Sequence, residues 1–156
     1  MNGYDLVLEA LLSKVISTDP VFGEIRESRL KKGHYYCDYP AKKLGYPGKD
    51  TFITFNDIPG DKTRKNFLNL LKNLKRTIQQ AKIMAKRHSK KWVNQLSKEE
   101  MKEVHMDIDD ISNTVPHIHF NKTNEIEVIF IGELLGGRTE LVIKNGRLTQ
   151  AYYIGG

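Results

Sequence analysis

The sequence contains a single cysteine, Cys37, among its 156 residues, so it cannot form an intramolecular disulfide. A lone thiol is compatible with a reducing compartment, and we expect a cytoplasmic location. The sequence has no run of about 20 apolar residues that could span a bilayer. Its first residues lack the basic segment of a secretory signal. We therefore expect neither a membrane protein nor a disulfide-framework protein, and no membrane partner.

Several motifs that bind cofactors or carry chemistry are also missing. The sequence has no phosphate-binding loop, no dinucleotide-binding glycine fingerprint, no zinc ribbon and no nucleophile elbow. Its paired glycine, Gly136-Gly137, precedes no helix and so indicates a turn rather than a phosphate cradle. We therefore expect no cofactor.

The composition is that of an ordinary globular domain. Hydrophobic residues make up 39% and charged residues 28% of an 18.0 kDa chain. A chain of this length can bury enough apolar surface to fold without disulfides or metals. We predict one domain over 1–156, with an N-terminal helix and irregular region (1–60), two helices (61–113) and an antiparallel sheet (114–156).

The positive charge is concentrated in one segment. Residues 61–91 contain eleven basic residues and one acid, Asp61, and carry +10, whereas the other 125 residues sum to −4. A lysine-rich helix that is merely solvated is one interpretation, but such helices usually mix signs because like charges at i,i+4 repel. The near absence of acids favours a polyanionic partner, RNA or DNA. The predicted contact residues are Lys72, Lys75, Arg76, Lys82, Lys86, Arg87, Lys90 and Lys91.

The first 113 residues are predicted to be mainly helical. Apolar residues recur at helical spacing over 4–17, over the basic segment 61–91, and over a second helix that begins with a Ser97/Glu100 capping box and ends near 113. Asp61 is a candidate cap for the basic helix. Residues 20–50 are predicted to be a largely irregular connection with at most one short strand, and 51–55 to be a strand.

The tail has a different pattern, with strands predicted over 115–120, 125–134, 139–144 and 147–153. Asn145-Gly146 supplies the residues that a type I′ hairpin turn requires. The predicted fold class is therefore α+β, with N-terminal helices packed on a C-terminal four-stranded antiparallel sheet.

The pair His117 and His119 is the candidate for chemistry. Residues i and i+2 of a strand share a face, so the two imidazoles are expected side by side, roughly 7 Å apart along the strand. Such a pair can cleave RNA: one group removes the 2′ proton and the other protonates the leaving 5′ oxygen. Cations that could stabilise the phosphate lie in the later strands: Arg138, Lys144 and Arg147.

Two other interpretations of this pair remain open. His-x-His on a strand is also a metal-ligand spacing, although no third ligand stands at motif spacing. The two residues could equally be ordinary histidines on the exposed face of a strand.

The tail resembles the sheet of the barnase, EndoU, colicin-nuclease and RelE-type ribonuclease superfamily. The resemblance covers about the last 40 residues, where 121–129 read NKTNEIEVI and 143–152 read IKNGRLTQAY. It implies an active site on the sheet face that the helices leave uncovered. By position it implies a histidine on the first tail strand, His117 or His119, and basic or hydroxyl groups on later strands: Arg138, Thr139 and Tyr152.

These observations lead to three functional hypotheses. The first is a small metal-independent endoribonuclease, a bacterial or phage toxin domain, in which the basic helix attracts RNA and the tail sheet cleaves it. An immunity or antitoxin protein would then be a candidate partner. The second is a non-enzymatic nucleic-acid-binding protein of phage or mobile-element origin. The third is an immunity or inhibitor protein whose charged helices contact a partner.

Overall fold

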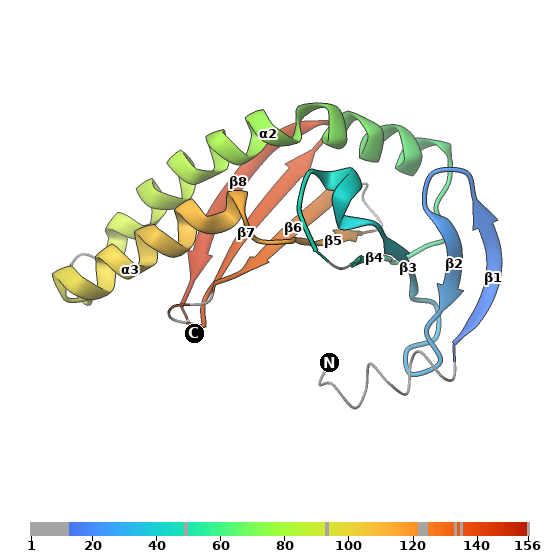
Figure 1. The fold of residues 1–156 in the computed structure, drawn as a ribbon, viewed down its shortest axis with the longest axis horizontal. Coiled ribbons are helices and arrows are strands. Elements are labelled where there is room, and N and C mark those ends of the chain that lie inside the picture. The colour runs from blue at the N-terminus through green and yellow to red at the C-terminus, as the bar shows by residue number, and fades with distance from the viewer. Residues whose placement is uncertain are drawn as a thin grey trace.

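The computed structural model describes residues 13–48, 50–92, 94–121, 125–132, 134 and 136–155. Eight strands form one sheet whose spatial order follows the chain from β1 to β8 (Figure 1). All neighbouring strands are antiparallel except β4 and β5, which are parallel. The strands are β1 (Lys14–Asp19), β2 (Gly23–Glu27), β3 (Tyr35–Tyr39), β4 (Thr51–Phe55), β5 (His117–Phe120), β6 (Glu125–Ile131), β7 (Arg138–Lys144) and β8 (Arg147–Ile154).

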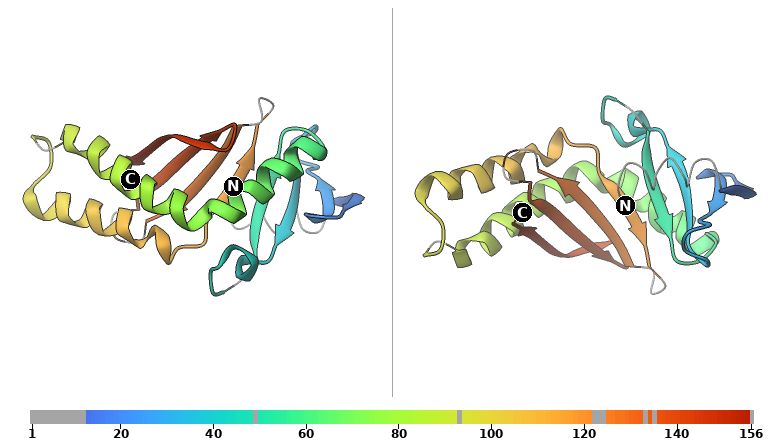
Figure 2. Two further views of the ribbon diagram at one scale, coloured as in Figure 1. Left: turned by 90° about the horizontal axis from the view of Figure 1, so that it is seen from above. Right: turned by 90° about the horizontal axis from the view of Figure 1, so that it is seen from below.

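The parallel pair is joined by a helical crossover. It consists of α2 (Asp61–Ser89), η2 (Lys90–Trp92), α3 (Lys98–Asp109) and η3 (Asp110–Ser112). Parallel strands need a long connection of this kind, because the chain must return to the same end of the sheet. Both helices lie on one face of the sheet, and Figure 2 shows the strands in front of them when the molecule is seen from below.

The predicted fold class is wrong. The sheet has eight strands rather than four, and the helices are inserted between its halves rather than preceding it. The tail meander itself is confirmed: β5 to β8 pair antiparallel in sequence order, and the Asn145-Gly146 turn joins β7 to β8. Asn145 has the positive φ, 51°, that this turn requires.

Three of the additional strands, β1 to β3, arise where a helix and an irregular connection were predicted, whereas β4 is the strand predicted over 51–55. Residues 4–12 of the predicted N-terminal helix lie outside the described residues, and from Lys14 onward the chain forms β1. Three of the six β1 residues are β-branched (Val15, Ile16 and Thr18), and such side chains pack well on a pleated surface.

The sequence pattern does not predict strands β2 and β3, because each is short and buries only alternate side chains. Ile25 in β2, and Cys37 and Tyr39 in β3, face the core, while their neighbours are polar or partly exposed. After β3, a single 3-10 turn, η1 (Ala41–Leu44), buries Ala41 and Leu44.

A buried carboxylate ties the first hairpin to the helix. Asp19 accepts hydrogen bonds from the backbone N–H groups of Val21 and Phe22 at 2.8 and 3.1 Å. Its other oxygen accepts a 2.6 Å bond from Arg64 in the first turns of α2. The predicted cap, Asp61, is not the cap: Gly60 holds that position, and Asp61 pairs with Arg64 at 2.6 Å.

The two helices otherwise follow their apolar patterns. In α2 the buried positions are Phe67, Leu70, Leu74, Ile78, Ala81, Ala85 and Ser89, whereas Leu68 is half exposed. The predicted capping box of α3 is confirmed in both directions. One carboxylate of α3, that of Asp107, is buried and accepts hydrogen bonds from the Tyr153 hydroxyl and the Leu134 N–H.

The core contains an aromatic cluster at the parallel junction. Phe22, Phe55, Phe67 and Phe120 are all buried, with ring centroids 4.9 to 6.1 Å apart. Phe55 and Phe120 are direct partners in the β4–β5 register and stack on each other. The cluster therefore joins β4, β5 and α2.

Truncation of this cluster tests its contribution to stability. We expect Phe120→Ala to lower the free energy of unfolding by about 3–5 kcal/mol, because it leaves a cavity between β4, β5 and α2. Leu68→Ala on the exposed side of α2 is the control, with an expected change within about 0.5 kcal/mol. Urea unfolding followed by circular dichroism measures both, and equal effects would contradict the assignment.

Candidate active site on the open sheet face

The two histidines of β5 face away from the helices. Ile118 and Phe120 are buried toward α2, so His117 and His119, which alternate with them, lie on the opposite face and are half-buried. The predicted side-by-side placement is therefore confirmed, on a face that no described helix covers.

One hydroxyl group connects the two imidazoles. Thr54 Oγ1 lies 3.2 Å from His117 Nε2 and 2.7 Å from His119 Nδ1. Thr54 is the β4 partner of His119 in the parallel register, which places its side chain between the rings. The hydroxyl oxygen can accept an N–H bond from each ring, whereas its single proton can go to only one ring nitrogen at a time. When both rings donate to Oγ1, His117 Nδ1 and His119 Nε2 are left to exchange protons with a ligand.

The local environment lowers the pKa of both histidines. For His117, burial is the main cause, and the neighbouring His119 adds to it. For His119, burial again dominates; Glu127 works in the opposite direction, while His34 and Lys31 lower the pKa further. Both rings therefore favour the neutral form near pH 7, and only His119 has a carboxylate that stabilises its protonated form.

The neighbours of His119 come from distant segments. Glu127 is its partner on β6. His34 and Lys31 belong to the loop between β2 and β3, which is closed by backbone bonds from Ser28 N to His34 O and from His34 N to Lys31 O. These residues, like Thr54, were not singled out from the sequence. Alternation places Thr54 and Glu127 on one face of their own strands, but no local signal pairs β4 with β5.

The other predicted site residues do not join the histidines. Arg138 lies on β7, two strands from β5, and its Nε pairs with Glu140 at 2.5 Å. Tyr152 on β8 donates a 2.6 Å hydrogen bond to the same carboxylate, which raises the pKa of Tyr152 to about 12. Neighbouring strands are about 4.8 Å apart, so these groups form a separate cluster roughly 10 Å or more away. Thr139 is 2% exposed and faces the helices.

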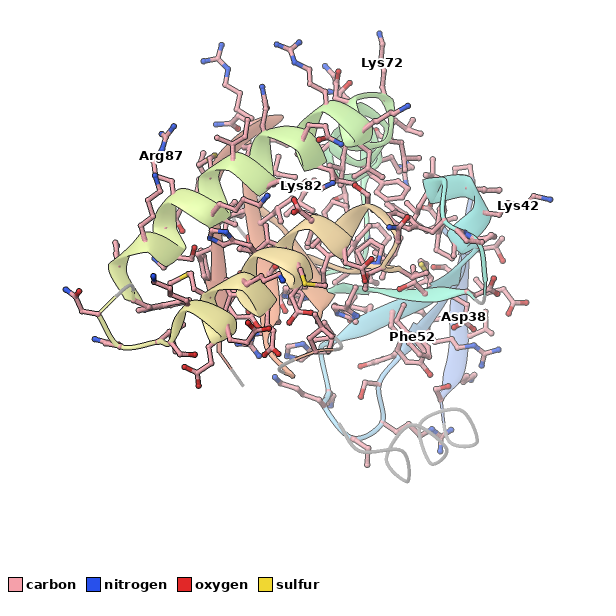
Figure 3. The ribbon with its side chains drawn as sticks, turned by 60° about the vertical axis from the view of Figure 1, so that its left-hand side comes forward. Asp38, Lys42, Phe52, Lys72, Lys82 and Arg87 are labelled. Atoms are coloured by element: carbon pink, nitrogen blue, oxygen red, sulfur yellow. The ribbon has the colours of Figure 1, made fainter. Side chains whose placement is uncertain are left out.

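The cations of α2 lie on the opposite side of the sheet from the histidines. Lys86 pairs with Asp109 at 2.6 Å. In Figure 3, Lys72 and Arg87 project from α2 away from the sheet, while Asp38 and Phe52 lie beyond the strands. The remaining members of the predicted set form no ion pair within the described part of the chain, and we call them the α2 ridge: Lys72, Lys75, Arg76, Lys82, Arg87, Lys90 and Lys91.

The remaining reactive side chains are the potential metal ligands and the thiol of Cys37. Within the described ranges, no three or more His, Cys, Asp or Glu residues are grouped in a way that could hold a metal ion. Cys37 is fully buried, and burial raises its pKa to about 12, so the thiol is neither exposed nor ionised. No helix among the described residues is apolar over the length needed to cross a membrane.

Comparison of the chain with protein-family models, curated proteins and solved structures found no match.

The lowered histidine pKa values predict how stability depends on pH. Below the ordinary imidazole value of about 6.5, the unfolded chain binds more protons than the folded chain. The free energy of unfolding should therefore fall as pH drops from 7.5 to 5.0, as measured by urea unfolding. The double variant His117→Gln/His119→Gln should show a shallower fall, whereas the non-titrating control Leu68→Ala should keep the original one. A steeper fall in the double variant would contradict the assignment.

Proposed function

We propose that the protein is a small metal-independent endoribonuclease that uses His117 and His119 as its acid–base pair. The observation that carries the proposal is the contact of both imidazoles with the Thr54 hydroxyl on the open face of the sheet. The resemblance of the tail to the barnase, EndoU, colicin-nuclease and RelE-type superfamily supports it. A bacterial or phage toxin domain, held in check by an immunity or antitoxin protein, is the biological setting that fits this activity.

The environments of the two rings suggest different roles. His119 stands beside Glu127, which stabilises an imidazolium, so we assign it as the general acid. His117 has no carboxylate among the causes of its shift, and its main neighbour is another imidazole, so we assign it as the general base. The nitrogens that do not contact Thr54, His117 Nδ1 and His119 Nε2, are the ones left to meet substrate.

The reaction is a transesterification followed by release of the product. His117 accepts the 2′-hydroxyl proton, the 2′ oxygen attacks phosphorus, and the bond from phosphorus to the 5′ oxygen breaks. His119 donates its proton to that leaving oxygen, which yields a 2′,3′-cyclic phosphate and a 5′-hydroxyl end. Lys31, in the loop above His119, is the cation we assign to the charge that grows on the phosphate.

Substitution of the pair tests this assignment. His117→Ala and His119→Ala should each lower cleavage of a fluorescent RNA oligonucleotide by roughly 10²-fold or more, with chelator present throughout. Because both pKa values are lowered and the acid must be protonated, the rate should peak below pH 6.5. His105→Ala on α3 is the control and should retain full activity. Full activity in both single variants would refute the proposal.

A non-enzymatic nucleic-acid-binding protein is the second candidate, and the unpaired cations of the α2 ridge favour it. A surface of this kind binds phosphate chains irrespective of sequence, with an affinity that falls steeply with salt. A gel-shift series in increasing salt measures that binding directly. Binding without cleavage of any RNA would select this second candidate over the endoribonuclease.

A further inference from the structure

A groove lies between the C-terminal part of α2 and the edge strand β8. Its volume is about 500 Å³. One wall is formed by the end of α2 and by η2, and the other by residues 149–152 of β8. The helical lining residues are Met84, Arg87, His88 and Lys91. This volume suits a ligand the size of one nucleotide and is far too small for a duplex.

The chemistry of the lining is that of a nucleotide site. Arg87 near the end of α2 and Lys91 in η2 are exposed and unpaired within the described residues, so they can both contact phosphate. Tyr152 and His88 present rings whose centroids are 5.9 Å apart, and the Trp92 ring makes an edge contact with His88 at 5.8 Å. Burial and the charge of Lys91 lower the pKa of His88, which keeps that ring neutral and suited to stacking.

The groove also lies between the α2 ridge and the open face of the sheet that carries His117 and His119. Arg87 and Lys91 belong to the α2 ridge, on the helix side of the sheet. Tyr152 belongs to the open face, where the register runs from Tyr152 through Glu140 and Ile129 to His117. Three strand spacings separate Tyr152 from His117, roughly 14 Å. A single-stranded nucleic acid bound in the groove would therefore have to turn around the β8 edge to reach the histidines.

We propose that this groove binds one nucleotide of a single-stranded nucleic acid, with its base against Tyr152 and His88 and its phosphates on Arg87 and Lys91. Unpaired bases stack on aromatic rings of this kind, and the groove has the cations to hold the backbone beside them. The inference rests on the proposed function in one respect only, namely that the bound strand is the RNA substrate of the histidine pair.

Binding of a labelled octamer of deoxyuridine tests the stacking role. This probe has no 2′-hydroxyl, so binding is measured without cleavage, by fluorescence anisotropy. Tyr152→Leu should weaken binding roughly tenfold, while Tyr152→Phe, which keeps the ring and loses the bond to Glu140, should bind like the original protein. An abasic octamer with the same phosphates should bind both variants equally. Equal weakening by Leu and Phe, or no weakening by Leu, would overturn the proposal.

Charge substitution at Arg87 and Lys91, compared with substitution near the start of α2, tests the phosphate contacts. Arg87→Gln/Lys91→Gln should reduce the salt dependence of octamer binding by a slope of about 1.4, the value for two lost single-strand phosphate contacts. Lys62→Gln/Lys65→Gln removes the same charge near the start of the helix and should leave the slope unchanged. The same loss in both double variants would mean that the ridge binds without a defined groove.

Two further measurements separate this inference from the proposed function. If the octamer binds as expected but no RNA is cleaved, the groove stands and the ribonuclease assignment falls. If RNA is cleaved through His117 and His119 while Tyr152→Leu binds the octamer normally, the ribonuclease assignment stands and the groove proposal falls.

Polyglutamate of equal charge, tested in competition, should not displace the octamer at equal concentration. If it does, charge alone accounts for the binding and the groove is refuted.

Discussion

The parallel pairing of β4 with β5 is the constraint on which the candidate site depends. In this register Ile53 lies beside Ile118 and Phe55 beside Phe120, and all four side chains are buried under α2. Because side chains alternate along a strand, burying these residues forces Thr54 and His119 onto the other face. A slip of one residue would send either the histidines or the threonine into the core. The contact between Thr54 and the two imidazoles is thus fixed by hydrophobic packing on the side of the sheet where no catalysis is proposed.

Burial and neighbouring charges then determine how readily each of the two histidines is protonated. Each is half-buried on the sheet surface, which is enough to disfavour the imidazolium without closing the ring off from solvent. Glu127 and Lys31 act on His119 in opposite directions, so the protonation of that ring depends on which of them a bound ligand engages. A phosphate that pairs with Lys31 would weaken its effect and, by its own charge, favour the protonated form of His119. Substrate binding would therefore prepare the acid that the reaction needs.

How much of this could be predicted from the sequence depends on how local each signal is. The long basic helix, the capping box at Ser97, the hairpin at Asn145-Gly146 and the common face of His117 and His119 all follow from patterns within a few residues, and each is observed. Strands β1 to β3 have weak periodicity and gain their stability from pairing, so a helix and a loop were predicted in their place. Thr54 could not be linked to the histidines because 65 residues and two helices separate it from His119. Arg138 was chosen for its charge, but its pairing with Glu140 depends on a register that charge does not reveal.

An eight-stranded sheet has two edges, and a polynucleotide can reach both of its faces only around one of them. At the β1 side a second hollow is lined by Lys14, Arg29 and Lys32 together with Glu27, Ile16 and Ser28, which offer charge but no aromatic ring. At the β8 side the groove combines cations with Tyr152 and His88. Charge attracts any polyanion, whereas a ring beside two cations distinguishes an unpaired base from a bare phosphate chain. On the proposed function, the first edge would attract a nucleic-acid strand by charge alone, and the second would hold it by base stacking as well.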